Sequence, residues 1–425
     1  MVVPSSLFHC CLMAALCGSP DEPDPDVWPG FRGRGDSVSM SRNLPVSWPA
    51  RGGRRGGWTV RLPGYGQSSP VVWRDQTYVT AVSGEEKERL HVICVGLDDG
   101  ARRWECEFPA TQRMPDSDSV SRGAPTPVVA AEAVFVMFES GDLFALTHEG
   151  DELWRRSLVA EFGEFKGPHG YASSPVLAGG FVVLQVCHSG PSYVLALDPK
   201  SGDTAWRTDH PSQTGWSTPA VVSSDDGELV IVSSAGSVRA YDARDGREQW
   251  FVVGLAGNST ASPSVAGDLV LIGASQREAA SPANSLGIRL GGAGDVTESH
   301  VVWRSPRAST GYSSPVAAHG LAWFVNKSGV AACVDVATGE VLWTVRLPGE
   351  CWASPAAFDD KVAFFCKGGD VVVYRAAPEE ELLGESSVSA TDIVYGIAAV
   401  DAAWLVRTGR SLIKVAADPG TANAP

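Results

Sequence analysis

A proline recurs at the start of one strand-like segment after another along this chain. Each copy follows a serine or a threonine, at Pro70, Pro127, Pro175, Pro219, Pro263, Pro315 and Pro355. Proline cannot donate a ladder hydrogen bond and is therefore excluded from central strands. A chain that repeats proline in this place must repeat an edge position, which indicates a series of similar sheets rather than one continuous sheet.

A second marker runs in phase with the prolines, namely a glycine followed four residues later by a tryptophan. It occurs as Gly100–Trp104, Gly150–Trp154, Gly202–Trp206, Gly246–Trp250 and Gly339–Trp343. Trp303 takes the same place in a unit without the glycine, and Leu382 or Leu383 takes it in the seventh unit. A degenerate eighth copy, "VYGIAAVDAAWLV" (394–406), aligns with "SSPVAAHGLAWFV" (313–325), and Gly396 replaces the proline.

Each unit is predicted to hold four strands, the first headed by the proline and the fourth carrying the tryptophan. Four-stranded antiparallel units of this length are the blades of a β-propeller, arranged radially around an axis. The first strand lines the axis and has one unpaired edge, so a proline there loses no ladder bond. We therefore predict an all-β, eight-bladed β-propeller of four-stranded antiparallel blades.

The two ends of the repeat region predict how the ring closes. The last unit ends at "SLIKVAAD" without a tryptophan strand, whereas "GGWTVRLPG" (56–64) closely matches "VLWTVRLPG" (341–349). We expect Trp58–Leu62 to be an N-terminal strand that completes the last blade. The strand-four tryptophans are expected to fill the space between neighbouring blades; they are Trp58, Trp104, Trp154, Trp206, Trp250, Trp303 and Trp343.

Residues 1–27 are expected to form a leader or linker, residues 28–416 the propeller, and residues 417–425 a disordered tail. The apolar stretch before "SPDEPDPD" resembles a secretory signal, although "MVVPSS" lacks the usual Lys or Arg. "AALC" at Cys17 loosely resembles a lipidation site. We expect export to the periplasm or envelope, with peripheral membrane association if Cys17 is lipidated, and a cytoplasmic protein if the leader is not a signal.

Composition excludes several classes of partner. The formal net charge of −15 disfavours binding to nucleic acid. No apolar run is long enough for a transmembrane helix. The histidines are scattered and the cysteines show no zinc spacing, so no metal site is expected. Cys94 and Cys106 flank one predicted hairpin, but cysteines in apolar runs are typically small buried hydrophobes.

The turn segments carry a resemblance to a known family. "ALDPKSGDTAW" (196–206) and "CVDVATGEVLW" (333–343) match the A-x-D-x-x-T-G-x-x-x-W signature. The chain resembles the pyrroloquinoline-quinone (PQQ) repeat propellers, which are quinoprotein alcohol dehydrogenase-like, over about residues 28–416. In the quinoprotein dehydrogenases the resemblance implies PQQ, calcium and a disulfide between adjacent cysteines. Here the adjacent pair is Cys10–Cys11, in the leader, and Asn258 near an axial mouth has no matching acidic partner, so neither cofactor is expected.

A second branch of that family fits better. The chain is similar in blade number and size to the propeller lipoprotein of the bacterial outer-membrane barrel-assembly machinery, which has no catalytic activity. Its start, "WPGFRGRGDSVS" (28–39), also resembles the lead-in of envelope-associated PQQ-repeat proteins. The resemblance implies a scaffold for protein partners, but it transfers no partner-binding residue.

Two regions are candidate sites. The longest connections, 109–123, 159–171 and 276–285, are expected on one face, where long loops on a rigid scaffold often bind partners. Loop 159–171 suits a protein contact through Glu161, Phe162, Phe165, Lys166 and His169, although such loops are equally often just solvated. Four rings are expected at the axial mouth, where they either stack a flat ligand or simply plug it: Tyr171, Trp216, Tyr312 and Trp352.

The sequence therefore predicts a non-catalytic, monomeric propeller that mediates protein–protein interaction in the bacterial cell envelope. A PQQ-dependent oxidoreductase is one alternative. A propeller that binds a small ligand or a glycan is the other, and the aromatic mouth favours it.

Overall fold

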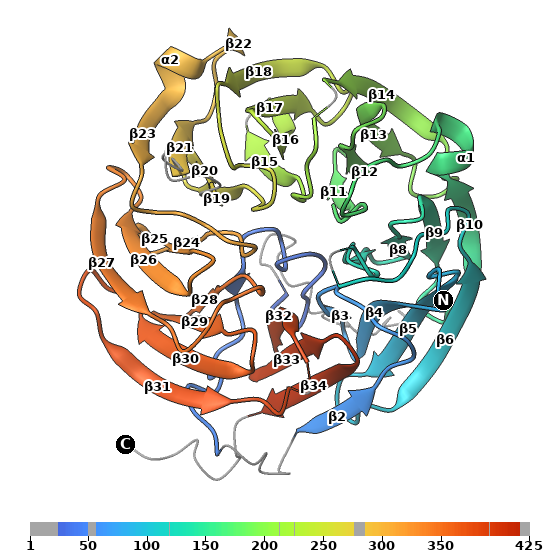
Figure 1. Cartoon of the computed structure of the whole chain (residues 1–425), viewed down its shortest axis with the longest axis horizontal. Helices are drawn as coiled ribbons and strands as arrows, with labels where there is room; N and C mark the ends of the chain where they lie inside the picture. Colours follow the sequence, from blue (N-terminus) through green and yellow to red (C-terminus); the bar gives the residue numbers. More distant parts are fainter. Residues whose placement is uncertain are drawn as a thin grey trace, which may run out of the picture.

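The structure is a computed structural model that describes residues 24–49, 57–118, 120–211, 213–224, 226–275, 285–390 and 392–416. The proposed leader up to residue 23, most of loop 276–285 and the tail from residue 417 lie outside these residues. Eight sheets of the described part surround a central axis like the blades of a wheel (Figure 1). The predicted eight-bladed, all-β propeller is confirmed. No helix in the described part is long and apolar enough to cross a membrane.

Each blade consists of four antiparallel strands that follow one another outward from the axis. Blades 1 to 4 comprise β3 (Val71–Trp73), β4 (Gln76–Ser83), β5 (Arg89–Gly96) and β6 (Arg102–Pro109); β7 (Val128–Val129), β8 (Val134–Met137), β9 (Asp142–Leu146) and β10 (Glu152–Ser157); β11 (Val176–Ala178), β12 (Phe181–Val186), β13 (Ser192–Leu197) and β14 (Thr204–His210); β15 (Ala220–Ser224), β16 (Gly227–Ser234), β17 (Ser237–Asp242) and β18 (Glu248–Val253).

Blades 5 to 8 comprise β19 (Ser264–Ala266), β20 (Leu269–Ile272), β21 (Ser285–Arg289) and β23 (Val301–Ser305); β24 (Val316–Ala318), β25 (Leu321–Val325), β26 (Val330–Asp335) and β27 (Val341–Arg346); β28 (Ala356–Phe358), β29 (Lys361–Phe365), β30 (Asp370–Arg375) and β31 (Leu382–Ser387); β32 (Val394–Val400), β33 (Ala403–Thr408), β34 (Ser411–Ala416) and β2 (Trp58–Arg61). The chain also forms β1 (Val38–Ser39), β22 (Gly294–Asp295), α1 (Leu158–Phe162) and α2 (Thr297–His300).

The residues that precede the prolines form a ring of hydrogen bonds around the axis. In blades 1 to 6 the backbone N–H of this residue donates to the hydroxyl of its counterpart in the next blade, at 2.8–3.0 Å. Six such bonds join blades 1 to 7, through Ser69, Thr126, Ser174, Thr218, Ser262, Ser314 and Ser354. In blade 8, Gly396 takes the proline's place because a Cβ there would lie 2.1 Å from the Ser69 Oγ.

The N-terminal segment 27–39 crosses the centre of the ring (Figure 1). Trp28 forms a bridge with Val72 of blade 1, and the Ser37 carbonyl accepts from Ala357 of blade 7. Arg32 is buried on the axis and donates to the Pro263 carbonyl at 3.2 Å, to the Ser264 hydroxyl at 2.8 Å and to the Pro315 carbonyl. Burial lowers the pKa of Arg32 to about 10.

The sequence predicted that the inner edge of every blade would be unpaired, but one of these edges is paired. β1, from the same N-terminal segment, runs parallel to β28 and pairs Val38 with Ala357. At blade 7 the expectation of a free axial edge is wrong, because a non-repeating part of the chain covers that edge.

Five of the seven strand-four tryptophans contact a glycine in the next blade, not the glycine of their own unit. The Trp206 indole N–H donates to the Ala243 carbonyl at 3.0 Å, and a Cβ on Gly246 would lie 2.3 Å from the Trp206 ring. The same contact joins four further pairs, Trp58 with Gly100, Trp104 with Gly150, Trp154 with Gly202, and Trp303 with Gly339. Trp250 faces the blade that lacks this glycine and packs near Val296 beside α2.

The seventh blade departs from the predicted pattern. Cys333 pairs with Trp343 in blade 6, and in the matching register of blade 7 Val373 pairs with Gly384. The expectation that Leu382 or Leu383 takes the tryptophan's place is therefore wrong. A Cβ on Gly384 would lie 2.6 Å from the Val46 carbonyl, because the N-terminal segment occupies this space.

Trp48 fastens that segment to the outer strand of blade 7. Its backbone N–H donates to the Ser386 hydroxyl at 2.7 Å, and its indole N–H donates to the Ser387 carbonyl at 2.8 Å. Farther along the chain, β2 is the outermost strand of blade 8. It runs antiparallel to β34, with Trp58 opposite Lys414 and Arg61 opposite Ser411. Segments from opposite ends of the described chain thus share one sheet.

Substitution of Arg32 tests the role of the N-terminal segment. Arg32→Ala is expected to lower the free energy of unfolding by about 2–4 kcal/mol, because it leaves several buried acceptors without a donor. The matched control is Arg34→Ala, since Arg34 is exposed and lies in the same segment; it should cost less than about 0.5 kcal/mol. Equal melting temperatures for the two variants in differential scanning calorimetry would contradict the role of Arg32.

The contact between tryptophan and glycine predicts the outcome of a matched pair of glycine substitutions. Gly246 and Gly320 have similar positive φ values, 71° and 76°, but a Cβ on Gly320 would meet nothing within 4 Å. Both Ala variants carry the backbone strain, and only Gly246→Ala also pushes into the Trp206 ring. Gly246→Ala should therefore be less stable than Gly320→Ala by about 2 kcal/mol in denaturant unfolding. Equal losses would argue against this contact.

Candidate functional site

The two described long connections are joined to each other on one face of the ring. The Gln112 side chain accepts from the Phe165 backbone N–H and donates to the Phe165 carbonyl, both at 2.9 Å. The Ser121 N–H donates to the His169 carbonyl at 2.9 Å. Loops 109–123 and 159–171 therefore form one surface, which we call the long-loop face.

The structure separates anchors from exposed groups within loop 159–171. Phe165 is only 6% exposed, so the expectation that it contacts a partner is wrong; it is a core residue that anchors the loop. Phe162 is half-buried against Tyr193, and the Arg207 guanidinium lies 4.6 Å from its ring centre. The remaining candidates are exposed, namely Glu161, Lys166 and His169.

Two of the exposed groups have partners within the chain. Glu161 forms an ion pair with Arg156, and the His169 ring packs edge-on against Trp216. Helix α1, at the start of the loop, is capped by Ser157, whose hydroxyl accepts from the Ala160 N–H at 3.3 Å. These contacts give the loop a defined shape before anything binds.

A buried ion pair supports the long-loop face and was not predicted. The Lys87 ammonium lies 3.5 Å from the Glu139 carboxylate, and both side chains are almost fully buried. Lys87 donates to the Ser121 carbonyl at 2.6 Å, and Glu139 accepts from the Gly123 N–H at 2.9 Å. Burial raises the pKa of Glu139, an effect that Lys87 opposes. No local motif marks these residues, because the pair forms between turns of different blades.

Aromatic rings at the axial mouth form an arc over blades 6, 7 and 8. The Tyr312 and Trp352 ring centres are 4.4 Å apart, and Trp352 lies 5.5 Å from Tyr395. The hydroxyls of Tyr395 and Tyr65 are 2.9 Å apart. We call these four residues the mouth arc; burial raises the pKa of Tyr65.

Two members of the arc were not predicted from the sequence. Tyr395 directly precedes Gly396, at the position where the other units have serine or threonine, so the repeat alignment does not mark it as a mouth aromatic. Tyr65 precedes the first unit, where no repeat marks it. Cationic groups lie over the rings: Lys327 over Tyr312 at 5.1 Å, Lys367 over Trp352 at 5.2 Å and Arg122 over Tyr65 at 3.7 Å.

The other two predicted mouth residues lie elsewhere. Tyr171 is 2% exposed and donates its hydroxyl to the Gln185 carbonyl at 3.1 Å, so its ring packs in the core and has no free face for a ligand. Trp216 donates its indole N–H to the Gly170 carbonyl at 2.9 Å. Trp216 and Tyr312 hold equivalent positions in blades 4 and 6, but blade 5 has Thr260 there, so no ring bridges the gap.

The polar groups near the axis do not fit a calcium-bound quinone. The Asn258 amide is used within the chain: its Nδ2 donates to the Ser234 carbonyl at 2.7 Å and its Oδ1 accepts from the Gly236 N–H at 3.1 Å. The carboxylate of Glu139 is likewise paired with Lys87. Arg32 places a cation on the axis instead of a cation ligand. The described residues contain no cluster of three His, Cys, Asp or Glu side chains suited to a metal.

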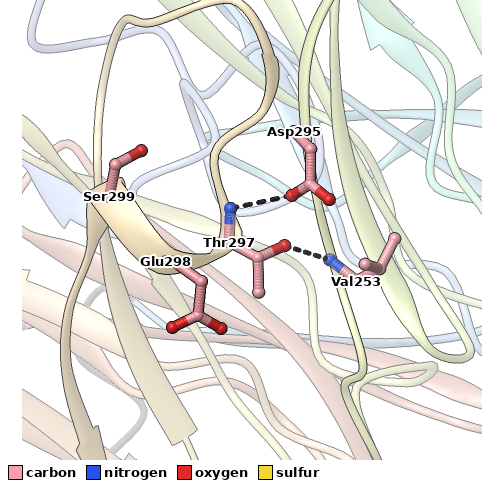
Figure 2. A pocket seen from close by; sticks show the side chains of 5 residues that line it. All are labelled: Val253, Asp295, Thr297, Glu298 and Ser299. Atoms are coloured by element: carbon pink, nitrogen blue, oxygen red, sulfur yellow. Dashed lines mark hydrogen bonds between the residues drawn. The ribbon is translucent and has the colours of Figure 1, made fainter.

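A hollow at the outer rim, beside α2, offers no better site (Figure 2). Its lining comprises Val253, Asp295, Thr297, Glu298 and Ser299. Figure 2 shows that its central polar groups bind one another: the Thr297 N–H donates to Asp295 at 3.0 Å, and the Val253 N–H donates to the Thr297 hydroxyl at 3.1 Å. These bonds fold the turn and are not directed at a ligand.

The link between the two loops can be tested by limited proteolysis. Gln112→Ala removes both bonds to Phe165, so trypsin is expected to cleave after Lys166 several-fold faster than in the wild type. Arg113→Ala is the matched control, since Arg113 is exposed and forms an ion pair with Glu86 across 3.6 Å. Cleavage at the same rate in all three proteins would show that Gln112 does not hold loop 159–171.

Known proteins resemble this chain both in sequence and in fold. Outer membrane protein assembly factor BamB of Moranella endobia (strain PCIT) is 27% identical over 231 residues, which are 51% of this chain and 56% of that protein. The match thus spans little more than half of the relative's length.

Two solved structures share the fold. The crystal structure of BamB from Moraxella catarrhalis matches with a TM-score of 0.63 at 13% identity, over 87% of this chain and 98% of that one. Quinohemoprotein alcohol dehydrogenase from Comamonas testosteroni matches with a TM-score of 0.66 at 13% identity, over 94% of this chain and 82% of that one. Identities this low show the fold alone, which an assembly factor and a dehydrogenase share.

The sequence profile of one family covers most of the repeats. It matches residues 42–192, 148–344 and 292–392, and its description is outer membrane protein assembly factor BamB. Because these segments together extend from residue 42 to residue 392, well over half of the chain, the protein belongs to this BamB family of propellers.

Proposed function

We propose that the protein is a non-catalytic scaffold that holds a protein partner on its long-loop face, in the bacterial cell envelope. The observation that carries this proposal is the hydrogen-bonded link between loops 109–123 and 159–171. Ordering a loop upon binding costs free energy, and a surface that is already ordered avoids that cost. A preorganised pair of long loops on a rigid ring is therefore suited to protein recognition.

The chemistry of the face supports a protein partner. Phe165 and Gln112 hold the loop from beneath, which leaves both signs of charge on the exposed side, at Glu164 and Lys166. Mixed charge around half-buried aromatic groups such as Phe162 resembles the rim of a protein interface. The relative from Moranella endobia supports this reading, since its name describes an assembly factor and not an enzyme.

The same relative supports a place in the envelope, since its name refers to outer membrane protein assembly. The Asn258 amide is already hydrogen-bonded within the chain and Arg32 is a buried cation, and both features argue against PQQ and calcium as cofactors.

One observation favours a second candidate function. The mouth arc exposes apolar ring faces, with Tyr312 44% exposed, which suits a small ligand or a glycan with a flat face.

Site-specific photo-crosslinking in the native organism tests the proposed partner face. A photoreactive phenylalanine analogue at residue 164 or 166 is expected to capture one and the same protein, because both positions are exposed on the long-loop face. The matched control position is Asp268, which is exposed in the turn between β19 and β20. Cross-linked products are identified by mass spectrometry and should be at least several-fold weaker at residue 268.

Equal capture at all three positions, or capture at none, would contradict the proposal. The second candidate would instead be supported by binding of the wild type to a glycan array that is lost in Trp352→Ala. Absorbance of PQQ retained after desalting in calcium would support the dehydrogenase alternative.

A further inference from the structure

Two cysteines in blade 7 lie within reach of each other. The Sγ atoms of Cys351 and Cys366 are 3.7 Å apart, and both side chains are buried. The other described cysteines lie in separate strands or turns, at Cys94, Cys106, Cys187 and Cys333. Cys94 pairs with Trp104 in the sheet and not with Cys106, so the hairpin considered from the sequence does not bring its two sulfurs opposite each other.

We propose that Cys351 and Cys366 are a dithiol site that is converted to an intrachain disulfide by exchange with an external disulfide. The two backbone segments that carry these cysteines are already spaced suitably for a disulfide. The Lys367 N–H donates to the Glu350 carbonyl at 2.6 Å, so the two segments lie side by side like paired strands. Paired strands are about 4.8 Å apart, and a disulfide needs α-carbons separated by about 4.4–6.8 Å. Side-chain rotation can therefore close the gap between the sulfurs without moving the blade.

The exchange balances in two steps. One cysteine thiolate attacks a sulfur of the external disulfide, which forms a mixed disulfide and releases one external thiol. The second cysteine thiolate then attacks the sulfur of the first cysteine, forms the intrachain bond and releases the second external thiol. The protein loses two hydrogen atoms and two electrons are passed to the external disulfide. Both sulfurs are buried, so the exchange requires the connection 347–355, which carries Cys351, to open.

The bond would connect two parts of the mouth. Cys351 directly precedes Trp352 of the mouth arc, and Cys366 directly precedes Lys367, whose ammonium lies over the Trp352 ring. Blade 7 is also where β1 pairs with β28 and where Trp48 is fastened. Oxidation would thus fix the connection that carries Trp352 to the β29–β30 turn. An oxidising compartment favours this state, but the site does not depend on the proposed partner face.

The test uses the purified full chain, equilibrated with oxidised or reduced glutathione, alkylated in denaturant and digested for mass spectrometry. In the oxidised sample we expect a peptide cross-linked between Cys351 and Cys366, lighter by two hydrogen atoms than its two reduced parts. Oxidation should also raise the melting temperature by about 4 °C, since the bond closes a short loop of the unfolded chain.

Two variants keep the result interpretable. Cys351→Ala should abolish both the cross-linked peptide and the rise in melting temperature, whereas Cys94→Ala should retain both. Because alkylation takes place in denaturant, every thiol that remains after oxidation is labelled, whether or not it is buried in the folded protein. The proposal is overturned if both cysteines of the wild type remain alkylated after oxidation, or if they pair with other cysteines instead of each other.

Discussion

The series of hydroxyl-to-amide bonds at the axis sets the spacing of blades 1 to 7. Innermost strands converge, so each blade has room there for little more than a serine or threonine and the proline that follows. A hydroxyl in one blade accepts from the backbone N–H of its counterpart in the previous blade, as Ser174 does from Thr126. The bond satisfies a buried donor that no strand partner can reach. The backbone hydrogen bonds of one repeat are therefore complete only when the next repeat is present.

The rim follows the same logic in the same direction along the chain, because each donor there also bonds to the next blade. Gly246 lies in the turn of blade 4, but the side chain that requires it is Trp206 of blade 3. Both markers of the repeat thus describe contacts between blades and not within one. A single blade has no partner for either, which is why stability in such proteins depends on interfaces between neighbouring repeats. It also explains why Trp250, which faces the blade without this glycine, packs instead in one apolar cluster with Val296, the residue before α2.

The repeating features of the fold could be predicted from the sequence, whereas the contacts made by non-repeating segments could not. The regular recurrence of prolines and tryptophans such as Pro315 and Trp343 is enough to predict the order of the strands and the number of blades, because each blade has the same geometry. The tryptophan's place in blade 7 was wrongly assigned to Leu382 or Leu383, because Val46, which requires Gly384 there, comes from a segment outside the repeat. Phe165 was placed on the surface because its anchor, Gln112, lies in another loop. The mouth arc was predicted in part, since Tyr312 and Trp352 belong to the repeat whereas Tyr65 does not.

The N-terminal segment bears on function because of where it lies. It occupies the centre of the ring with a buried cation, Arg32, whose guanidinium binds carbonyls from blades 5 and 6. A metal ion placed nearby would be repelled by that charge, and a low dielectric would strengthen the repulsion. Part of the axis is thereby filled by the chain itself, and the surfaces left for partners are the loops around it. A propeller stabilised in this way can vary its loops without disturbing its centre, which is the property that a binding scaffold needs.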